Sequence, residues 1–351
     1  MTSSQLPEFP SFRHPAKRRL FITGGTGFLG RSLLDLLATI APQCWPDLQI
    51  DVLSRDPSAF LRRFPHYADH RWLSIVEGSL DRLPEGRGYT DLIHGAADTH
   101  WDGDKLTWLT QLVDGTRQIL AFARETKVQR LVFLSSGAVY GPRPDELPLD
   151  ESQPQAPLST DVSKLYGHGK RMAETLCALY SAQYGVPSVI ARCFAVVSGH
   201  VPLDGPYAVG NFLRDALDPN RPAIVVRGTG QAVRTYIDGS DMARWLLAML
   251  DHGTPGAAYN LGGDQPITTL ALAEMVARIV SPGKPVHVER QVETSSQSDR
   301  SVYVPSVERA RGLGLVARVP LEESIAVAAR HITLRGVLPS SRPSAIFGSF
   351  A

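Results

Sequence analysis

The residues best suited to chemistry are a tyrosine and a lysine four positions apart, Tyr166 and Lys170, in the segment YGHGK. In a helix this spacing places both side chains on one face. A free tyrosine has a pKa of about 10, and we expect a neighbouring ammonium group to lower it by favouring the phenolate. Tyr166 could then exchange a proton with a substrate hydroxyl while a hydride passes to or from a nicotinamide. Lys170 could also hold the ribose of that cofactor.

A pair of serines supplies the next candidate group. Ser135 and Ser136 end the apolar run RLVFLSS, which is typical of a buried strand. A hydroxyl at the end of a strand could bind the reacting oxygen of a substrate, or it could only cap the strand. Because neighbouring side chains of a strand point in opposite directions, one serine faces the ligand, and we predict that it is Ser136.

A glycine-rich segment, TGGTGFLG, follows the first apolar strand and opens a helix. Gly24 can form the tight turn, Gly27 lets the backbone approach a pyrophosphate, and Gly30 lets the helix pack closely on the strand. The helix begins near Phe28 and Leu29, where free N–H groups and the positive end of the helix dipole favour phosphate. The segment therefore predicts a dinucleotide site.

The residues after the second strand bear on the choice of dinucleotide. An NAD site usually has an acid here that accepts from the ribose 2′-hydroxyl. In this chain Ser54 could donate to a 2′-phosphate and Arg55 could pair with it, although Arg55 could also be a solvated surface charge. Asp56 keeps NAD possible. We expect NAD(P) as cofactor, with NADP(H) favoured, and expect the small Ala96 and Ala97 to let it approach the next strand.

The segments that would position these residues alternate between strand and helix patterns. Apolar strands alternating with amphipathic helices predict an α/β protein with a Rossmann-type, doubly wound parallel sheet, which binds ligands beyond the carboxyl ends of its strands. Expected strands are 19–23, 48–53, 72–78, 91–97, 130–136 and 187–194, and expected helices are 28–40, 105–125 and 162–184.

After Phe194 the elements become shorter and richer in glycine and proline, which predicts a smaller C-terminal α/β substrate lobe. The expected division is a flexible N-terminal extension (1–18), a dinucleotide-binding domain (19–195, with 232–262 returning to it), a substrate-binding lobe (196–231 and 263–335) and a tail (336–351).

Composition excludes several kinds of partner. A net charge of +1 over 351 residues gives no reason to expect nucleic acid or an anionic membrane surface. No run approaches the ~18 apolar residues of a membrane span. The three cysteines have no metal-binding spacing, so we expect no metal site and free thiols, as in a reducing cytoplasm.

Together, TGGTGFLG, SSGAVYG and YxxxK resemble the extended short-chain dehydrogenases, specifically the nucleotide-sugar epimerase/dehydratase family, and the likeness spans residues 19–332. The resemblance implies a nucleoside-diphosphate sugar as substrate. It also implies that Arg234 and Arg300 clamp the diphosphate and that Asn211 donates to it, with a surface ion pair as the alternative for Arg300. Members of the family usually dimerise through two long helices, which implies a homodimer through residues 105–125 and 162–184.

This chain departs from the family pattern at several positions. Gly137 and Ala138 stand where 4,6-dehydratases carry an Asp-Glu pair, and Leu112, Ala195 and Ser79 replace polar residues of the pattern. Without that acidic pair, elimination of water needs another acid–base group.

We therefore expect hydride and proton transfer at C4 of the sugar, by a 4-ketoreductase. The alternative is a 4-epimerase that retains NAD(P). A 4,6-dehydratase using Asp98 or His100, a decarboxylase, or a non-catalytic dinucleotide sensor ranks lower.

Overall fold

The computed structural model of the chain describes residues 18–45, 47–85, 88–97, 103–141, 148–153, 155–289 and 302–336. Arg300, Asp98, His100 and almost all of the expected extension and tail lie outside these ranges. No helix in the described ranges is long and apolar enough to cross a membrane.

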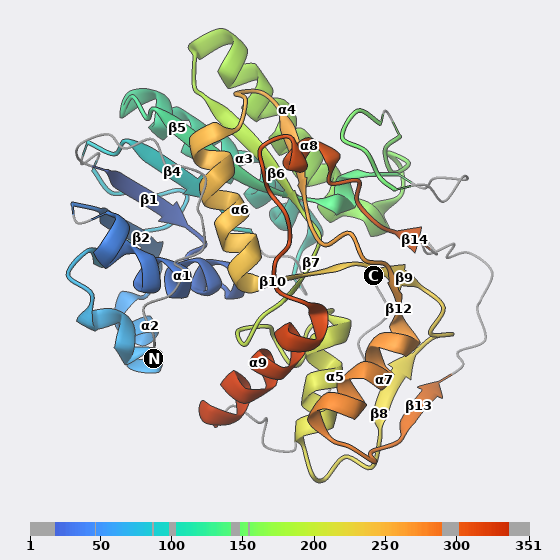
Figure 1. Cartoon of the computed structure of the whole chain (residues 1–351). Coiled ribbons are helices and arrows are strands. Elements are labelled where there is room, and N and C mark those ends of the chain that lie inside the picture. Colours follow the sequence, from blue (N-terminus) through green and yellow to red (C-terminus); the bar gives the residue numbers. More distant parts are fainter. Residues whose placement is uncertain are drawn as a thin grey trace.

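The centre of the fold is a seven-stranded sheet in which every neighbouring pair is parallel (Figure 1). The spatial order is β11-β6-β5-β4-β1-β2-β3, so the chain reverses direction across the sheet between β1 and β4. Such a switch point is where open parallel sheets bind ligands. The strands are β1 (Arg19–Thr23), β2 (Gln49–Ser54), β3 (Leu73–Glu77), β4 (Asp91–His94), β5 (Arg130–Ser136), β6 (Ser188–Cys193) and β11 (Ala258–Leu261).

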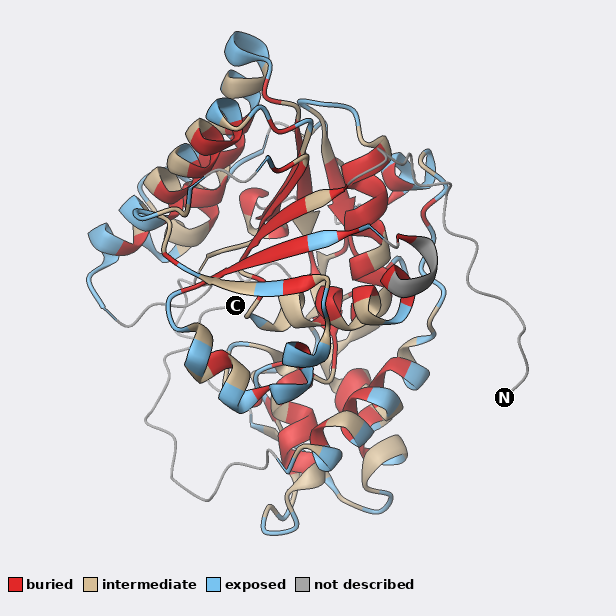
Figure 2. Ribbon diagram, turned by 90° about the vertical axis from the view of Figure 1, so that its left-hand side faces the viewer, coloured by how far each residue is buried: buried red, intermediate tan, exposed pale blue. Residues whose placement is uncertain are grey.

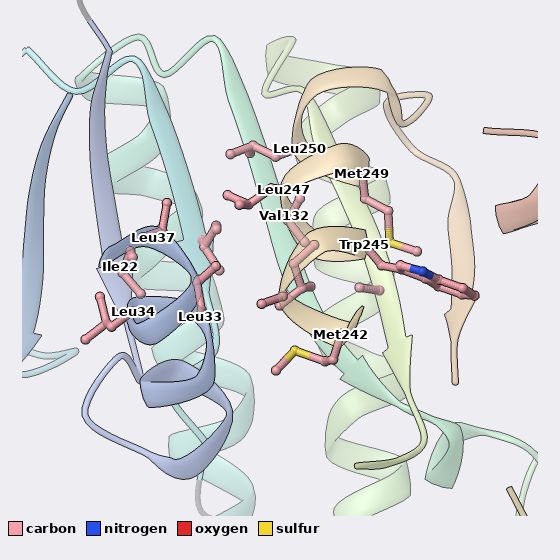
Figure 3. Close-up of a cluster of buried hydrophobic side chains, with 14 of the residues drawn as sticks. Ile22, Leu33, Leu34, Leu37, Val132, Met242, Trp245, Leu247, Met249 and Leu250 are labelled. Atoms are coloured by element: carbon pink, nitrogen blue, oxygen red, sulfur yellow. The ribbon is translucent and has the colours of Figure 1, made fainter. Parts of the chain in front are cut away.

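Helices cover both faces of this sheet, and the alternation along β1 shows how. Leu20 and Ile22 belong to a buried cluster with α1 (Phe28–Cys44) and α6 (Gly239–His252), part of which Figure 3 shows. Phe21 belongs instead to a cluster with α3 (Lys105–Glu125) and α4 (Leu165–Tyr184). The predicted doubly wound Rossmann-type sheet is confirmed. Figure 2 shows the strands largely buried and the outer helix surfaces exposed.

A smaller body of helices and short strands lies below the sheet in Figure 1 and has its own apolar cluster. Its strands form pairs or triplets: β10 with β7, β13 with β8, and β12-β9-β14. The helices are α5 (Ala208–Leu217), α7 (Thr269–Val280) and α9 (Leu321–Leu334), and the strands are β7 (Ala195–Val197), β8 (Ile224–Arg227), β9 (Val233–Arg234), β10 (Tyr236–Asp238), β12 (Ile267–Thr268), β13 (Val286–Glu289) and β14 (Val302–Tyr303).

The segment expected to return to the first domain divides between the two parts. Strand β11 lies in the large sheet and α6 packs on α1, whereas β9 and β10 pair with strands outside that sheet. The domain boundaries themselves stay a proposal. Five short elements complete the described chain: α2 (Pro57–Arg63), α8 (Glu308–Arg311) and the 3-10 turns η1 (Pro65–Asp69), η2 (Gly137–Val139) and η3 (Val162–Lys164).

Candidate active site

The glycine turn between β1 and α1 packs directly against the end of β4. Gly24 has a φ of +75°, and a Cβ on it would lie 2.4 Å from the carbonyl carbon of Gly95 and 2.6 Å from the nitrogen of Ala96. A Cβ on Gly30 would lie 2.4 Å from the carbonyl oxygen of Gly24. Both positions therefore require glycine, in the places that the sequence predicts.

The amino end of α1 is open to an anion. Its N-cap residue, Gly27, is exposed, no side chain caps the helix, and the first turn has no acidic residue. Among the described residues, the one atom within 4 Å of a Cβ placed on Gly27 is the Gly24 oxygen, at 3.2 Å, so these residues leave space beside Gly27. The free N–H groups of this turn, which contains Phe28 and Leu29, suit the pyrophosphate of a dinucleotide.

At the end of β2 the carboxylate that could bind a ribose is already engaged. Asp56 Oδ1 accepts from the Ala59 nitrogen at 2.8 Å and so caps α2. Ser54 is buried, and its hydroxyl accepts from the Asp56 nitrogen at 3.3 Å. Arg55 is exposed, and no ion pair of Arg55 occurs within the described residues. The free charge at this strand end is thus a guanidinium group.

Tyr166 lies in the first turn of α4, near Ser136 at the carboxyl end of β5. Trp108 of α3 stacks on it, with ring centroids 6.0 Å apart and planes 16° apart. Burial raises the pKa of Tyr166, with smaller contributions from Tyr207 and Tyr303, and a hydrogen bond with Ser136 opposes the rise. The structure therefore brings Ser136 and Tyr166 together.

Lys170 lies on the same face of α4, one turn further on. Its Nζ donates to the Leu134 carbonyl at 2.7 Å and lies 5.9 Å from the centroid of the Tyr166 ring. Burial lowers the pKa of Lys170 to about 8. From the sequence we expect the Lys170 ammonium to lower the pKa of Tyr166. In the structure burial has the largest effect and raises it.

The two serines at the end of β5 point to different partners. Ser135 is buried and donates to Glu174 Oε1 at 2.5 Å, and Glu174 also pairs with Arg192 at 2.7 Å. Ser136 is only half-buried and contacts Tyr166. Strand alternation therefore turns Ser135 towards Glu174 of α4 and Ser136 towards Tyr166, and the Ser136 hydroxyl also accepts from the Ala138 nitrogen at 3.1 Å.

Tyr303, which the sequence reasoning missed, reaches this site from β14. A Cβ on Gly137 would lie 2.1 Å from the Tyr303 hydroxyl oxygen and 2.7 Å from the Phe194 ring. The space that a longer side chain at position 137 would use is thus filled by a phenol. Tyr303 comes from a segment that sequence reasoning singled out only for Arg300, and no local pattern marks it.

Two of the residues expected to bind substrate, Arg234 and Asn211, lie in the second body. Arg234 pairs in register with Tyr303, and its guanidinium carbon lies 5.6 Å from the Tyr303 ring centroid, which brings it towards the site. Asn211 donates to the Gly205 carbonyl at 3.1 Å, so its amide already has a local partner. Tyr207, one turn before Asn211, contacts the Phe28 ring at 5.2 Å and links α5 to the glycine turn.

Residues near the cofactor-binding edge are small or neutral. Ala96 and Ala97 follow β4, and the Ala96 nitrogen donates to the Thr23 hydroxyl at 3.3 Å. His94 is buried and its Nδ1 lies 2.6 Å from the same hydroxyl. Burial, with a smaller contribution from Lys170, lowers the pKa of His94 to about 3, so it is a neutral packing residue.

The sequence of the chain is similar to those of a known protein family and of several characterised proteins. Residues 20–262 match the NAD dependent epimerase/dehydratase family. The dTDP-D-glucose 4,6-dehydratase of Bos taurus is 27% identical over 333 residues, which cover 88% of this chain and 86% of that protein. The UDP-glucuronic acid decarboxylase 3 of Arabidopsis thaliana is 25% identical over 330 residues, covering 92% and 91%.

Solved structures share the fold. A dTDP-glucose 4,6-dehydratase from Streptomyces venezuelae with NAD and TYD bound has a TM-score of 0.76 at 24% identity and covers 91% of this chain and 98% of that one. A UDP-glucuronic acid 4-epimerase from Bacillus cereus in complex with UDP-glucuronic acid and NAD has a TM-score of 0.76 at 19% identity, with 90% and 99% covered.

Proposed function

The chain belongs to the NAD dependent epimerase/dehydratase family, and on this premise we propose that it transfers a hydride and a proton at C4 of a nucleoside-diphosphate sugar. The observation that carries the proposal is the position of Ser136 beside Tyr166, whose pKa the serine hydroxyl lowers, with Lys170 one helical turn away on the same sheet edge as the glycine turn. Relatives that carry out dehydration, decarboxylation and 4-epimerisation act on substrates of this class.

The chain's own groups divide the proton chemistry between them. Tyr166 would give or take the proton of the C4 oxygen, while Ser136 donates to that oxygen and keeps it close. The raised pKa of Tyr166 favours the neutral phenol, which is the form that protonates a keto oxygen during reduction. Lys170, fixed by the Leu134 carbonyl, would bind the ribose hydroxyls. A nicotinamide held beside these groups supplies or accepts the hydride.

The residues around the glycine turn fit a dinucleotide, because Gly27 leaves space beside the uncapped amino end of α1. We favour NADP(H): the Asp56 carboxylate caps α2, while the exposed Arg55 can pair with a 2′-phosphate. The two structural relatives described above contain NAD, which is the alternative.

Among reactions at C4 we favour reduction of a 4-keto sugar, with 4-epimerisation on retained NAD(P) as the second candidate. Dehydration ranks lower although dehydratases are among the relatives. It needs one group to remove the C5 proton and another to protonate the leaving hydroxyl. Gly137 and Ala138 offer neither, and the Tyr303 hydroxyl fills the space at Gly137.

Two assays separate the candidates. Purified protein is denatured, and the released small molecules are examined by absorbance and mass spectrometry. Protein that carries no dinucleotide and oxidises NADPH with a nucleoside-diphosphate 4-keto sugar supports the reductase. Tightly retained NAD(P), with interconversion of C4 epimers and no net oxidation, would replace it by the epimerase.

A further inference from the structure

Charged side chains from three segments meet around the ring of Phe64, just after α2. The guanidinium carbons of Arg31 and Arg335 each lie 4.5 Å from the Phe64 ring centroid, and that of Arg63 lies 5.3 Å away. Arg31 comes from α1, Arg63 ends α2, and Arg335 is the C-cap residue of α9. The cluster thus joins the nucleotide-binding part of the chain to the last helix of the second body.

These arginines have no carboxylate of their own. Within the described ranges none of the three forms an ion pair within 4.0 Å. The carboxylate in their midst, Asp35 of α1, accepts from the Tyr67 hydroxyl and from His200 Nε2, both at 2.6 Å. Asp35 thus forms its short contacts with Tyr67 and His200 rather than with one of these arginines.

The positive charges of these arginines lower one another's pKa. Burial, followed by the charges of Arg335 and Arg63, lowers the pKa of Arg31 to about 10. Burial also lowers the pKa of Arg335, with Arg63 adding to the shift. Like charges held close together are stabilised when an anion binds between them. An anion bound between these arginines would therefore reduce the electrostatic repulsion among them.

Two histidines complete the cluster. His331 of α9 packs on the loop after β7, where a Cβ on Gly199 would lie 2.5 Å from its ring atoms. His200 receives a hydrogen bond from Arg335 on Nδ1 at 2.7 Å. Because arginine can only donate, Nδ1 is the acceptor and Nε2 carries the proton that bonds Asp35.

Asp35, His200 and His331 place their ligand atoms within 4.8 Å of one another, a spacing that a metal ion could also use. A cation is disfavoured here for two reasons. Both nitrogens of His200 are occupied, and Arg31 and Arg335 would repel a second positive charge. Guanidinium groups instead match the oxygens of a phosphate in pairs.

We propose that Arg31, Arg63 and Arg335 form an anion site for a phosphate group, either free or carried by a nucleotide, that ties α9 to α1 and α2. Arg63 is exposed and the Asp35 side chain is 39% exposed, so the cluster can be reached from solvent. Arg31 follows the glycine turn and its Nε donates to the Gly27 carbonyl at 3.4 Å, whereas Arg63 and Arg335 belong to α2 and the end of α9, on which the proposed reaction does not depend.

The test compares phosphate binding by purified full-length variants. Arg63→Met and Arg335→Met each remove one guanidinium group, and Arg62→Met is the control, because Arg62 is an exposed arginine of the same helix that makes no contact with Phe64. Inorganic phosphate is titrated by calorimetry, and the melting temperature is followed with phosphate. We expect Arg63→Met and Arg335→Met to weaken binding by about 5–30-fold, the loss of one charge-assisted contact, and Arg62→Met to behave as wild type.

Further experiments identify the source of the phosphate and test whether the cluster binds a metal ion instead. Tighter binding of AMP than of phosphate, lost in the same two variants, assigns the site to a nucleotide phosphate; equal binding assigns it to free phosphate. Unchanged phosphate binding in Arg63→Met and Arg335→Met, or an equal loss in Arg62→Met, overturns the proposal. Zn²⁺ that stabilises wild type but not His331→Ala, without any effect of phosphate, would replace it with a metal site.

Discussion

At the scale of single residues, Ser135 and Ser136 differ by which side of β5 they face, and this makes them a matched pair. Ser136 lies beside Tyr166, whereas Ser135 donates to the buried Glu174. We expect Ser136→Ala to lower kcat by about 10²-fold, the effect of removing one donor to a developing oxyanion.

Ser135→Ala should have the opposite profile. Its kcat should stay within a few-fold of wild type, while the free energy of unfolding falls by about 1–3 kcal/mol because a buried charged partner loses a hydrogen bond. Steady-state kinetics and urea denaturation check both variants. A larger loss of kcat in Ser135→Ala than in Ser136→Ala would reverse the assignment.

Lys170 gives a pH-dependent prediction. Its pKa is about 8 in the fold against 10.5 ordinarily, because burial disfavours the charged form. Between these values the unfolded chain binds more protons than the folded chain, so this lysine's contribution to stability rises with pH. Below pH 8 the buried ammonium group lowers the free energy of unfolding by a constant amount. Lys170→Met removes this effect, and it also abolishes turnover.

We therefore expect wild type to gain about 2–3 kcal/mol in unfolding free energy relative to Lys170→Met as pH rises from 8 to 10, at 1.36 kcal/mol per pKa unit. Urea denaturation of both proteins at several pH values measures it. Parallel stability profiles would show that the ammonium is not desolvated in the native state.

At the scale of elements, the end of β2 and the start of α2 bear on our proposal that the cofactor is NADP(H). The Asp56 carboxylate caps α2, which leaves Arg55 as the free charge. We expect Arg55→Ala to raise KM for NADPH by about 5–30-fold, through loss of one exposed charge-assisted contact, and to leave KM for NADH unchanged. Wild-type protein that uses both cofactors equally, with no change in the variant, contradicts this.

The elements themselves were largely predictable because their patterns are local. The helix expected at 105–125 and the strand at 130–136 match α3 and β5, since each carries its own apolar period. The helix expected from 162 begins as α4 at Leu165, because Asp161 caps a 3-10 turn, Val162–Lys164, before it. A single turn of this kind leaves no distinct period in a sequence.

The site was predictable only where a motif is contiguous. Gly24, Tyr166 and Lys170 belong to short motifs, whereas Trp108 and Tyr303 reach Tyr166 from separate segments through packing between elements. Side chains that meet through packing between separate elements follow no spacing rule in the sequence, so sequence reasoning could not find them.

At the scale of the whole molecule, the outer faces of α3 and α4 expose apolar side chains. Leu106 is 70% exposed and Met172 51%, while Leu112 and Leu120 of α3 are buried in the fold of the chain itself. We propose that the exposed set, with Leu179 of α4, joins two copies in a homodimer.

Two substitutions on one face test this assembly. We expect Met172→Glu with Leu179→Glu to give a monomer, because two charges would be buried at the interface. Val327→Glu on α9, where the side chain is 49% exposed, is the control and should stay dimeric. Light scattering at micromolar concentration measures the mass. Wild-type protein that is already monomeric would rule out the dimer.

The central claim is hydride transfer at C4 without loss of water from C5 and C6, and NMR of the reaction products tests it most directly. Pure protein is incubated in deuterated water with NAD(P)(H) and nucleoside-diphosphate hexoses in their 4-keto or 4-hydroxy forms. We expect the wild-type protein to give a product changed only at C4, with no deuterium at C6. We expect no product from Tyr166→Phe under conditions where that variant still binds dinucleotide. A 6-deoxy-4-keto sugar labelled at C6 would contradict it.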